Sequence, residues 1–467
     1  MSLPTELSLP AMQAWIDSHD SQWLKEYQTF LSFPSISSEP AYQADLLACQ
    51  AWIMNELKKM NFLVESWPTS GHPVIYAHYS VSPSLPTLLI YNHYDVQPVD
   101  PLDLWLSPPF EPTEREGEIY ARGAQDNKGQ CFYVLQALKL LIDQTGTLPL
   151  NVKLCIEGEE EIGSAGLSKI LDQKRKALKA DYLAVVDMGL REAHQPALTL
   201  GIRGIVTFDV TLEGSKTDLH SGSHGGIVPN PLHALVQLLA GLKDDQGQVT
   251  IPHFYSQVKP LSPAEQQHIS LDFDSTKYTE QTGAIPVGGE KNFSPLARAW
   301  MRPTLEINGL WGGYQGTGFK TVIPAQAHAK LSCRLVAQQK PAQIAELVSN
   351  YLKSQAPVGV NVSVIVHPGV GEAVHVSPNS YLVQMFAQAL TEVYGRPCEY
   401  ILAGGSIPVV SQLTQAAGGD MILLGLGLDS DQIHAPNEHF GIDRLKKGML
   451  MMARAMQLLS KKDTSHR

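Results

Sequence analysis

Several apolar runs of strand length end in an acidic residue or a histidine, and this pattern limits the possible folds more than any other feature of the sequence. Segments with helix-period apolar spacing, such as 131–141 and 167–178, lie between these runs. Strands alternating with helices predict a doubly wound, mainly parallel α/β sheet, whose strands all end at one edge. The runs and their polar ends are 88–91 with His93, 151–156 with Glu160 and Glu161, and 182–186 with Asp187.

A different pattern occupies the middle of the chain. Gly204-Ile-Val-Thr-Phe-Asp-Val-Thr-Leu212 alternates apolar with polar or small residues, as half-buried antiparallel strands do. Helical spacing at 231–242 and 342–352 predicts two helices on one antiparallel sheet. From residue 379 the helix and buried-strand pattern returns. We therefore expect a smaller two-layer α+β domain inserted into the α/β domain, with limits 1–202, 203–377 and 378–467.

Composition excludes several classes of partner. The 467 residues carry 35 basic and 46 acidic side chains, a net charge of −11, and no basic block. We therefore expect no nucleic-acid partner and no binding to an anionic membrane. The N-terminus has no signal-peptide pattern, and there is no apolar run long enough to span a membrane, so a cytoplasmic protein is predicted. The five cysteines are widely spaced in apolar contexts, which favours reduced core residues.

His93 and Asp95 lie two residues apart at the end of a predicted strand, and therefore on one face. That spacing suits a metal ligand and the carboxylate that orients its ring. Asp126 lies just before a predicted helix, at the mouth of a strand-to-helix connection. Each has an ordinary alternative, because a surface turn could contain His93 and Asp95, and Asp126 could be a helix N-cap.

Two imidazoles and several carboxylates follow successive strands, and all of them would meet at one edge of a parallel sheet. Such a set suits two zinc-like ions with one bridging carboxylate and positions left open for water. Alone, each residue could be a solvated loop acid, a helix cap or a surface histidine; their joint occurrence favours a metal centre. The set comprises His93, Asp126, Glu160, Glu161, Asp187 and His434.

Glu160 and Glu161 are expected to have separate roles. Neighbours at the end of a strand point to opposite sides and do not easily bind the same ion. One would bind metal, and the other could act on a water molecule.

Seven short motifs, in this order along the chain, resemble the cocatalytic di-metal peptidases, the family of carnosinase, glutamate carboxypeptidase, aminoacylase, acetylornithine deacetylase and succinyl-diaminopimelate desuccinylase. The resemblance covers essentially the full length and is greatest to the carnosinase-like dipeptidases. The motifs are Tyr91-Asn-His-Tyr-Asp-Val-Gln-Pro98, Leu104-Trp with Pro108-Pro-Phe110, Ala121-Arg-Gly123 with Asp126-Asn-Lys-Gly129, Glu157-Gly-Glu-Glu160, Asp218-Leu-His-Ser-Gly222, Thr321-Val-Ile-Pro-Ala325 and Gly404-Gly-Ser-Ile-Pro-Val409.

The resemblance implies a role for each candidate in the metal centre. Glu160 would be the general base, and the peptide bond between Asp126 and Asn127 would be cis. The implied ligands are His93 and Asp187 for one metal, Glu161 and His434 for the other, and Asp126 as the bridge.

The resemblance also implies residues that contact the substrate. His220 would donate a hydrogen bond to the oxyanion, in the active site of the other subunit of a homodimer. Arg334, Thr321 and Ser406 would contact the substrate backbone or its terminal carboxylate, and a guanidinium can grip a carboxylate through two parallel hydrogen bonds. The ordinary alternatives are a turn histidine for His220 and a strand-edge salt bridge for Arg334.

We therefore predict a cytoplasmic metallopeptidase that hydrolyses dipeptides or similar small amides bearing a free carboxylate. Its α/β domain would be catalytic, and the inserted domain would be a lid or dimerisation domain. It would use two divalent ions, for which zinc fits best and manganese or cobalt also fit. The alternatives are an N-acyl-amino-acid deacylase or carboxypeptidase with the same machinery, and a silent member that only binds metal or peptide. Glu160 argues against a silent member, because a binding protein needs no unliganded acid beside its metals.

Overall fold

The computed structural model describes residues 6–261 and 268–461. Contacts within the chain divide it into two compact units, and the chain leaves the first unit and later returns to it. Unit 1 comprises Met1–Leu200, Val376–Ile401 and Val409–Arg467, and unit 2 comprises Gly201–His375 and Leu402–Pro408. Residues 251–301 fall in unit 2, and residues 262–267 among them lie outside the described part.

The main sheet of unit 1 has the strand order β1-β2-β6-β3-β7-β17-β8, and its four central strands run parallel. The outer strands β1, β2 and β8 pair antiparallel. The central strands are almost wholly buried, which explains their unbroken apolar runs. The strands are β1 (Leu63–Trp67), β2 (Val74–Tyr79), β3 (Thr87–His93), β6 (Asn151–Glu157), β7 (Tyr182–Val186), β8 (Ala197–Ile202), β16 (Glu399–Ala403) and β17 (Asp420–Leu424).

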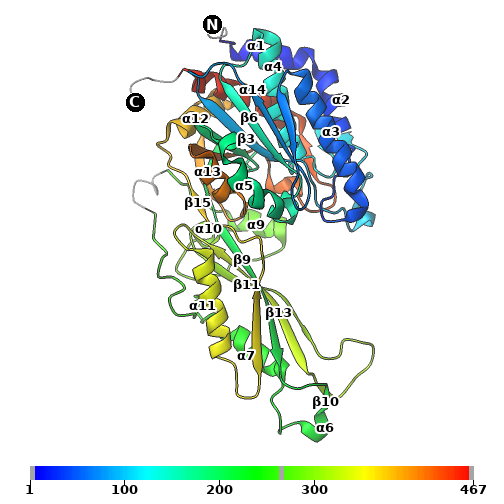
Figure 1. The fold of residues 1–467 in the computed structure, drawn as a ribbon. Helices are drawn as coiled ribbons and strands as arrows, with labels where there is room; N and C mark the ends of the chain where they lie inside the picture. The colour runs from blue at the N-terminus through cyan, green and yellow to red at the C-terminus, as the bar shows by residue number, and fades with distance from the viewer. Residues whose placement is uncertain (1–5, 262–267, 462–467) are drawn as a thin grey trace. The chain divides into compact units, whose positions relative to one another are not determined.

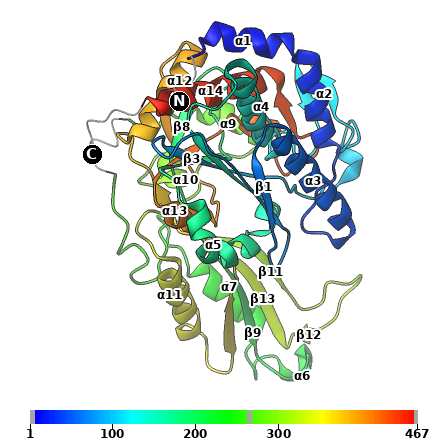
Figure 2. The same ribbon diagram turned by 45° about the horizontal axis from the view of Figure 1, so that its top comes forward.

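Helices cover both faces of this sheet (Figure 2). The helices α4, α12 and α14 pack together on one face, and α5 and α13 pack on the other. α14 approaches α4 closely at Gly448, which has no side chain. A Cβ atom there would lie only 2.5 Å from the ring of Tyr133. The helices are α1 (Leu9–Ser18), α2 (Asp20–Leu31), α3 (Gln43–Lys59), α4 (Lys128–Thr145), α5 (Ala165–Leu178), α12 (Tyr381–Tyr394), α13 (Val410–Ala417) and α14 (Ile442–Ser460).

A small sheet in unit 1 joins two segments far apart in the sequence. It has the order β18-β5-β4, and His439 of β18 pairs with Tyr120 of β5. The segment preceding α4 is thereby held beside the segment preceding α14. Its strands are β4 (Thr113–Arg115), β5 (Glu118–Tyr120) and β18 (His439–Gly441), and the 3-10 turns of unit 1 are η1 (Pro40–Tyr42), η2 (Leu102–Leu104), η3 (Glu160–Ile162) and η4 (Asp429–Asp431).

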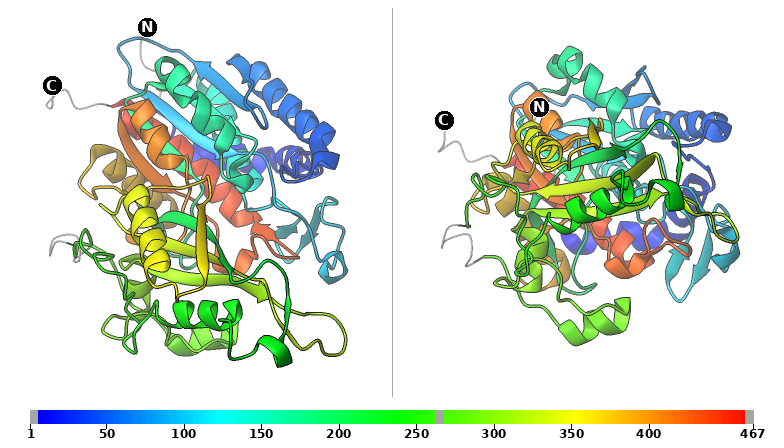
Figure 3. Two further views of the ribbon diagram at one scale, coloured as in Figure 1. Left: turned by 60° about the horizontal axis from the view of Figure 1, so that its bottom comes forward. Right: turned by 90° about the horizontal axis from the view of Figure 1, so that it is seen from below.

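Unit 2 is built on an antiparallel sheet of order β11-β13-β9-β14 (Figures 1 and 3). Alternate residues of β9 are buried, and they share one hydrophobic core with the apolar sides of α7 and α11. The elements are β9 (Gly204–Glu213), β10 (Leu219–His220), β11 (Thr304–Gly312), β12 (Val322–Ile323), β13 (Gln326–Leu335), β14 (Asn361–Val366), β15 (Val374–His375), α6 (Ser221–His224), α7 (Pro231–Ala240), α9 (Ser275–Thr282), α10 (Pro295–Trp300) and α11 (Pro341–Ser354).

These arrangements confirm the fold class predicted from the sequence, a mainly parallel α/β sheet with an inserted two-layer α+β part. All five cysteines are free thiols, and only Cys398 is not fully buried. Among the described residues, no helix combines the length and the apolar character that crossing a membrane requires.

Candidate metal centre

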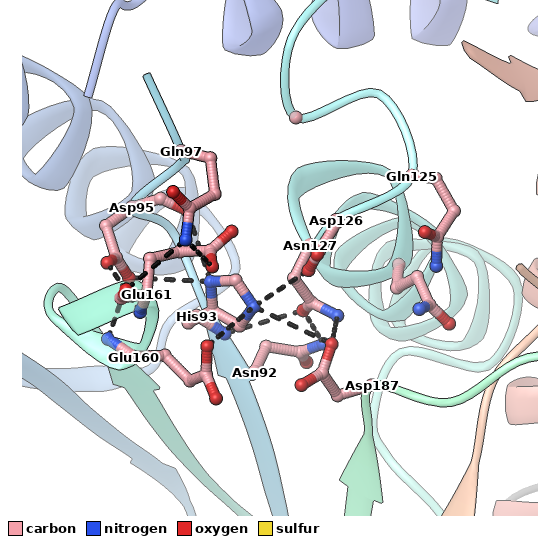
Figure 4. A network of polar contacts seen from close by, with 12 residues as sticks. Asn92, His93, Asp95, Gln97, Gln125, Asp126, Asn127, Glu160, Glu161 and Asp187 are labelled. Carbon is pink, nitrogen blue, oxygen red and sulfur yellow. Dashed lines mark hydrogen bonds and ion pairs between the residues drawn. The ribbon is translucent and has the colours of Figure 1, made fainter. Parts of the chain in front are cut away.

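The candidate ligands of unit 1 lie where the parallel strands end. His93 is the last residue of β3, and Asp187 directly follows β7. Glu160 and Glu161 open η3, three residues after β6, while His434 lies on the loop that follows β17. Because the carboxyl ends of parallel strands share an edge, these side chains converge with Asp126, as Figure 4 shows for all but His434.

Asp126 stands between the two histidines. Its Oδ1 lies 3.1 Å from Nε2 of His93, and its Oδ2 lies 2.9 Å from Nε2 of His434. Asp187 Oδ1 is 3.6 Å from His93 Nε2, and Glu161 Oε2 is 3.3 Å from His434 Nε2. The residues therefore form two groups of possible ligands, His93 with Asp187 and His434 with Glu161, and Asp126 belongs to both.

Glu160 stands beside these groups and belongs to neither. Its Oε2 lies 3.9 Å from Nε2 of His93. The expected reason for separating Glu160 from Glu161 was wrong, because both residues lie in the 3-10 turn η3 and not at the end of a strand. A 3-10 turn has about three residues per turn, so consecutive side chains point roughly a third of a turn apart. In Figure 4 the two carboxylates accordingly lie on different sides of the His93 ring.

Asp95 fixes both the His93 ring and the turn η3. Nδ1 of His93 lies 3.1 Å from the backbone oxygen of Asp95 and 3.4 Å from its Oδ1. The Asp95 carboxylate also accepts hydrogen bonds from the backbone N–H groups of Glu160 and Glu161, each at 3.1 Å. A partner on Nδ1 holds the ring so that Nε2 faces the centre.

Two amide side chains that the sequence analysis did not single out support the ligands. Asn127 Nδ2 donates to Asp187 Oδ1 at 2.6 Å, and Gln97 Nε2 donates to Glu161 Oε2 at 2.9 Å. Both residues lie in motifs that resemble the peptidase family. An amide side chain close to a predicted ligand within such a motif could have identified each of them from the sequence. Asn127, and not Asp126, is the N-cap residue of α4, which removes the ordinary alternative for Asp126. The peptide bond between Asp126 and Asn127 is cis, as expected.

Burial and crowding shift the protonation of these groups. Burial, followed by neighbouring carboxylates, raises the pKa of Glu161 to about 7, and burial likewise raises the pKa values of Glu160 and Asp187. Hydrogen bonds to Asp126 and Glu161 raise the pKa of His434 to about 10. Burial opposes a charge on His93, but Asp187 and the other surrounding acids raise its pKa well above its usual value.

The donor set of the centre fits divalent cations. Among the described residues, no Lys or Arg forms an ion pair with Asp126, Glu160, Glu161 or Asp187, so four crowded acids face only two histidines. The Oε1 atom of Glu161 is buried without a hydrogen-bond partner. Buried carboxylates are stable when they are paired or bind a metal, and imidazole with carboxylate is a donor set for zinc.

A second cluster of acids and a histidine in unit 1 has a different character. Glu118, Asp431 and His439 lie close enough together to bind an ion. The guanidinium of Arg444, however, donates to Asp431 at 2.7 Å and to Glu118 at 3.1 Å. An arginine already neutralises these acids, so the cluster is an internal ion-pair network.

In unit 2, Arg334 and Ser406 lie together. Arg334 donates from an NH group to Ser406 Oγ at 2.9 Å, and Ser406 Oγ donates to the backbone oxygen of Arg203. No carboxylate among the described residues pairs with Arg334, so the alternative of a salt bridge is not observed. Arg203, which the sequence analysis missed, lies near Arg334, and burial together with that neighbour lowers its pKa to about 10.

His220 and Thr321 lie on a second part of unit 2. His220 pairs with Val322 across β10 and β12, and the backbone N–H of Ser221 donates to the carbonyl oxygen of Thr321 at 3.0 Å. Nδ1 of His220 accepts a hydrogen bond from the N–H of Gly222 at 3.1 Å. The ring proton therefore lies on Nε2, which makes the exposed side of this histidine a donor.

Comparison with known proteins finds metallopeptidases that are similar to this chain along nearly its whole length. The chain is 30% identical over 469 residues to the Cys-Gly metallodipeptidase dug1 of Schizosaccharomyces pombe, covering 95% of this chain and 97% of that relative. It is similar in structure to the M20 family metallo-carboxypeptidase Sso-CP2 of Sulfolobus solfataricus (TM-score 0.86, 34% identity, 94% of this chain and 100% of the other). Human carnosine dipeptidase 1 is also similar (TM-score 0.83, 27% identity, 98% and 100%).

The family assignment follows from a match over most of the chain. The model of peptidase family M20/M25/M40 matches residues 89–458, which contain every candidate metal ligand, all of unit 2 and most of unit 1. This match confirms the resemblance found from the seven motifs. The chain belongs to peptidase family M20/M25/M40.

Proposed function

We propose that this peptidase hydrolyses dipeptides, or similarly small amides with a free carboxylate, with two divalent metal ions. The observation that carries the proposal is the position of Asp126, whose two oxygens face the two histidines at 3.1 and 2.9 Å. A carboxylate placed in this way can bridge two ions. The names of the relatives, a Cys-Gly metallodipeptidase and a carnosine dipeptidase, support a dipeptide substrate.

Each residue of the centre then has a chemical task. When bound, the two ions would lower the pKa of a water molecule and stabilise negative charge that develops on the substrate. His93 and Asp187 would hold one ion, Glu161 and His434 the other, with Asp126 shared. Glu160 takes a proton from the attacking water and passes it to the leaving amine. Its position outside both ligand groups and its raised pKa support this role.

The residues of unit 2 would bind the substrate. Arg334, which has no carboxylate partner among the described residues, would grip the free carboxylate, with Ser406 and Thr321 contacting the substrate backbone. His220 would donate from Nε2 to the oxyanion, within a homodimer.

A second candidate function is removal of the C-terminal residue from a longer peptide or of an acyl group from an amino acid. The similarity to the metallo-carboxypeptidase Sso-CP2 favours the first of these. Both reactions use the same metal centre and the same carboxylate contact, so only the room for the rest of the substrate would differ.

A turnover assay with a substrate panel tests the proposal. The panel comprises Cys-Gly, β-Ala-His, several other dipeptides, a tetrapeptide and N-acetyl-amino acids, each with added zinc, manganese or cobalt. We expect dipeptides to be cleaved fastest, the activity to be lost with a chelator, and zinc to restore it. Faster cleavage of the tetrapeptide or of the acetylated amino acids would support the second candidate. Absence of any turnover by the metal-loaded protein would support the silent member.

Three further properties belong to the same proposal. We propose zinc as the native metal, since imidazole and carboxylate donors suit it, and a homodimer as the active form. The five free cysteines support a cytoplasmic location. The net charge of −11 supports the absence of a nucleic-acid partner.

A further inference from the structure

One buried carboxylate outside the ligand set connects the segment that carries Asp126 with the segment that carries His434. Glu438 is fully buried, four residues after His434 and more than 300 residues from Asp126 in the sequence. Its backbone oxygen accepts a hydrogen bond from the N–H of Ala121 at 3.0 Å. The two segments therefore meet at Glu438 through its backbone as well as its side chain.

The side chain of Glu438 is saturated with donors. Its Oε2 accepts from the Arg122 guanidinium at 2.7 Å and from the N–H of Gly123 at 2.9 Å. Its Oε1 accepts from the N–H groups of Gln125 and Asp126, each at 3.0 Å. An ionised carboxylate can accept all four bonds, two on each oxygen. A glutamine could not, because its NH₂ group would face two donors.

The loop around His434 needs such an anchor. Gln432, His434 and Asn437 all have positive φ angles, of 56°, 60° and 64°, which are uncommon for residues other than glycine and persist only where the surroundings enforce them. At the start of this loop, the carboxylate of Asp431 accepts hydrogen bonds from Arg444 and from the N–H of Leu428. Glu438 holds the other end.

The loop that carries Asp126 is held mainly by the same side chain. Asp126 itself is bonded to Glu438 through its backbone N–H, and Gly123 and Gln125 of its loop are bonded to the same carboxylate. Asp126 is the one ligand common to both groups, so a shift of its loop would disturb both at once. In metal sites, the groups that orient a ligand commonly change metal affinity by about 10–100-fold when they are removed.

We propose that Glu438 is a positioning residue of the metal centre, which holds Asp126 in register with His434 and thereby sets the affinity of both metal sites. The proposal rests on the metal centre of the proposed function and does not depend on which peptide is cleaved. A failure to find a dipeptide substrate would therefore leave it intact, and metal binding can be measured without any substrate.

The test measures zinc affinity on the metal-free full chain, by competition with a chromophoric chelator, for Glu438→Gln and Glu438→Asp. We expect Glu438→Gln to weaken zinc binding at both sites by about 10–100-fold. Glu438→Asp keeps the charge but is one methylene shorter, so we expect an intermediate loss. Thermal unfolding of the metal-free variants is measured in parallel, because a loss of metal affinity in a chain that remains folded separates positioning from general stability.

Glu290→Gln provides the matched control. Glu290 of unit 2 is also a buried carboxylate, and it pairs with the guanidinium of Arg302 at 2.8 and 2.9 Å. Its substitution removes a buried acid and arginine pair without touching the metal centre, so zinc affinity should stay within about twofold of the wild type. Three outcomes would overturn the proposal. Glu438→Gln could bind zinc as tightly as the wild type, it could lose affinity at one site only, or both metal-free variants could fail to fold.

Discussion

The metal centre of unit 1 and the predicted substrate residues of unit 2 differ in how firmly their own surroundings hold them. His93 and Asp95 are fully buried, and neighbouring side chains or backbone groups fix His93, Asp126, Glu161 and Asp187. His220 and Thr321 are exposed on two-residue strands or beside them. The fold of unit 1 therefore brings the candidate ligands together by itself, whereas the side chains of His220 and Thr321 remain exposed on unit 2.

This difference predicts two kinds of response to substitution. Substitutions in unit 1 should act on metal binding. The loss of binding should be nearly complete, because no other group can replace a ligand that is lost from a buried site. Changes in unit 2 should leave metal binding intact and act on turnover or substrate affinity. The following experiments either separate the two kinds of response or show that the distinction is wrong.

The largest effect is expected for Asp126→Asn. Asn has one carbonyl oxygen where Asp126 presents an oxygen to each histidine, so both metals should be weakened and turnover should fall by about a thousandfold or more. Metal content is measured by elemental analysis beside the rate. Asp181→Asn is the control, since Asp181 is an exposed acid of unit 1 that accepts from the N–H of Thr87. A variant that keeps both metals would refute the shared role of Asp126.

His220→Ala should reduce turnover by about 10²–10³-fold, as loss of an oxyanion donor does, with metal content unchanged. His224→Ala, four residues away, should be close to the wild type. If His220 serves the other subunit, co-expression of His220→Ala with Glu160→Ala should restore activity. With random pairing about half of the dimers would be hybrids with one intact site, giving roughly a quarter of wild-type turnover. An inactive but verified hybrid would place His220 in its own subunit or outside catalysis.

Metal affinity should increase with pH. In the metal-free protein the pKa of His434 is about 10 and that of Glu161 is about 7, so both groups hold protons that a metal must displace. Affinity should therefore rise by up to about tenfold per pH unit for each proton released, with His434 releasing one proton below pH 10 and Glu161 another below pH 7. His93, whose pKa is also raised well above its usual value, adds a further proton. Zinc titrations in chelator-buffered solutions from pH 6 to 9 measure the slope. A zinc affinity that does not change with pH would contradict the prediction that these groups hold protons in the metal-free protein.

The smallest effect is expected for Arg334→Lys. Lysine keeps the charge but cannot make two parallel hydrogen bonds, so KM for dipeptides should rise by about tenfold while metal content is unchanged. The same change should have little effect on substrates with an amidated C-terminus, which the wild type should cleave poorly. Arg302→Lys, a guanidinium of unit 2 that is already paired with Glu290, is the control. Equal rates for free-acid and amidated dipeptides would remove Arg334 from this role.

Much of unit 1 could be predicted from the sequence, because buried parallel strands are unbroken apolar runs and their ends are marked by polar residues. His93 and Asp187 were found in this way, directly at the ends of β3 and β7. Glu160 and Glu161 were found for a partly wrong reason, since a 3-10 turn and not a strand end separates their directions.

Residues that act through contacts distant in sequence could not be predicted. Glu438 bonds to groups more than 300 residues away, and no local pattern distinguishes such a glutamate from a solvated one. Arg203 and Arg334 lie near one another only because the sheet of unit 2 and the segment around Ser406 bring them together. Tertiary packing, and not periodicity, decides these positions.

Measuring metal content and turnover on one preparation of Glu160→Gln separates proton transfer from metal binding most directly. Glu160 lies beside the ligand groups without belonging to either, and we propose that it carries the proton. Glu118→Gln, from the cluster that Arg444 already neutralises, is the control and should keep both metals and most of the rate. We expect Glu160→Gln to retain two metal ions per chain and to lose nearly all turnover. Loss of both ions, or a rate close to that of the wild type, would contradict it.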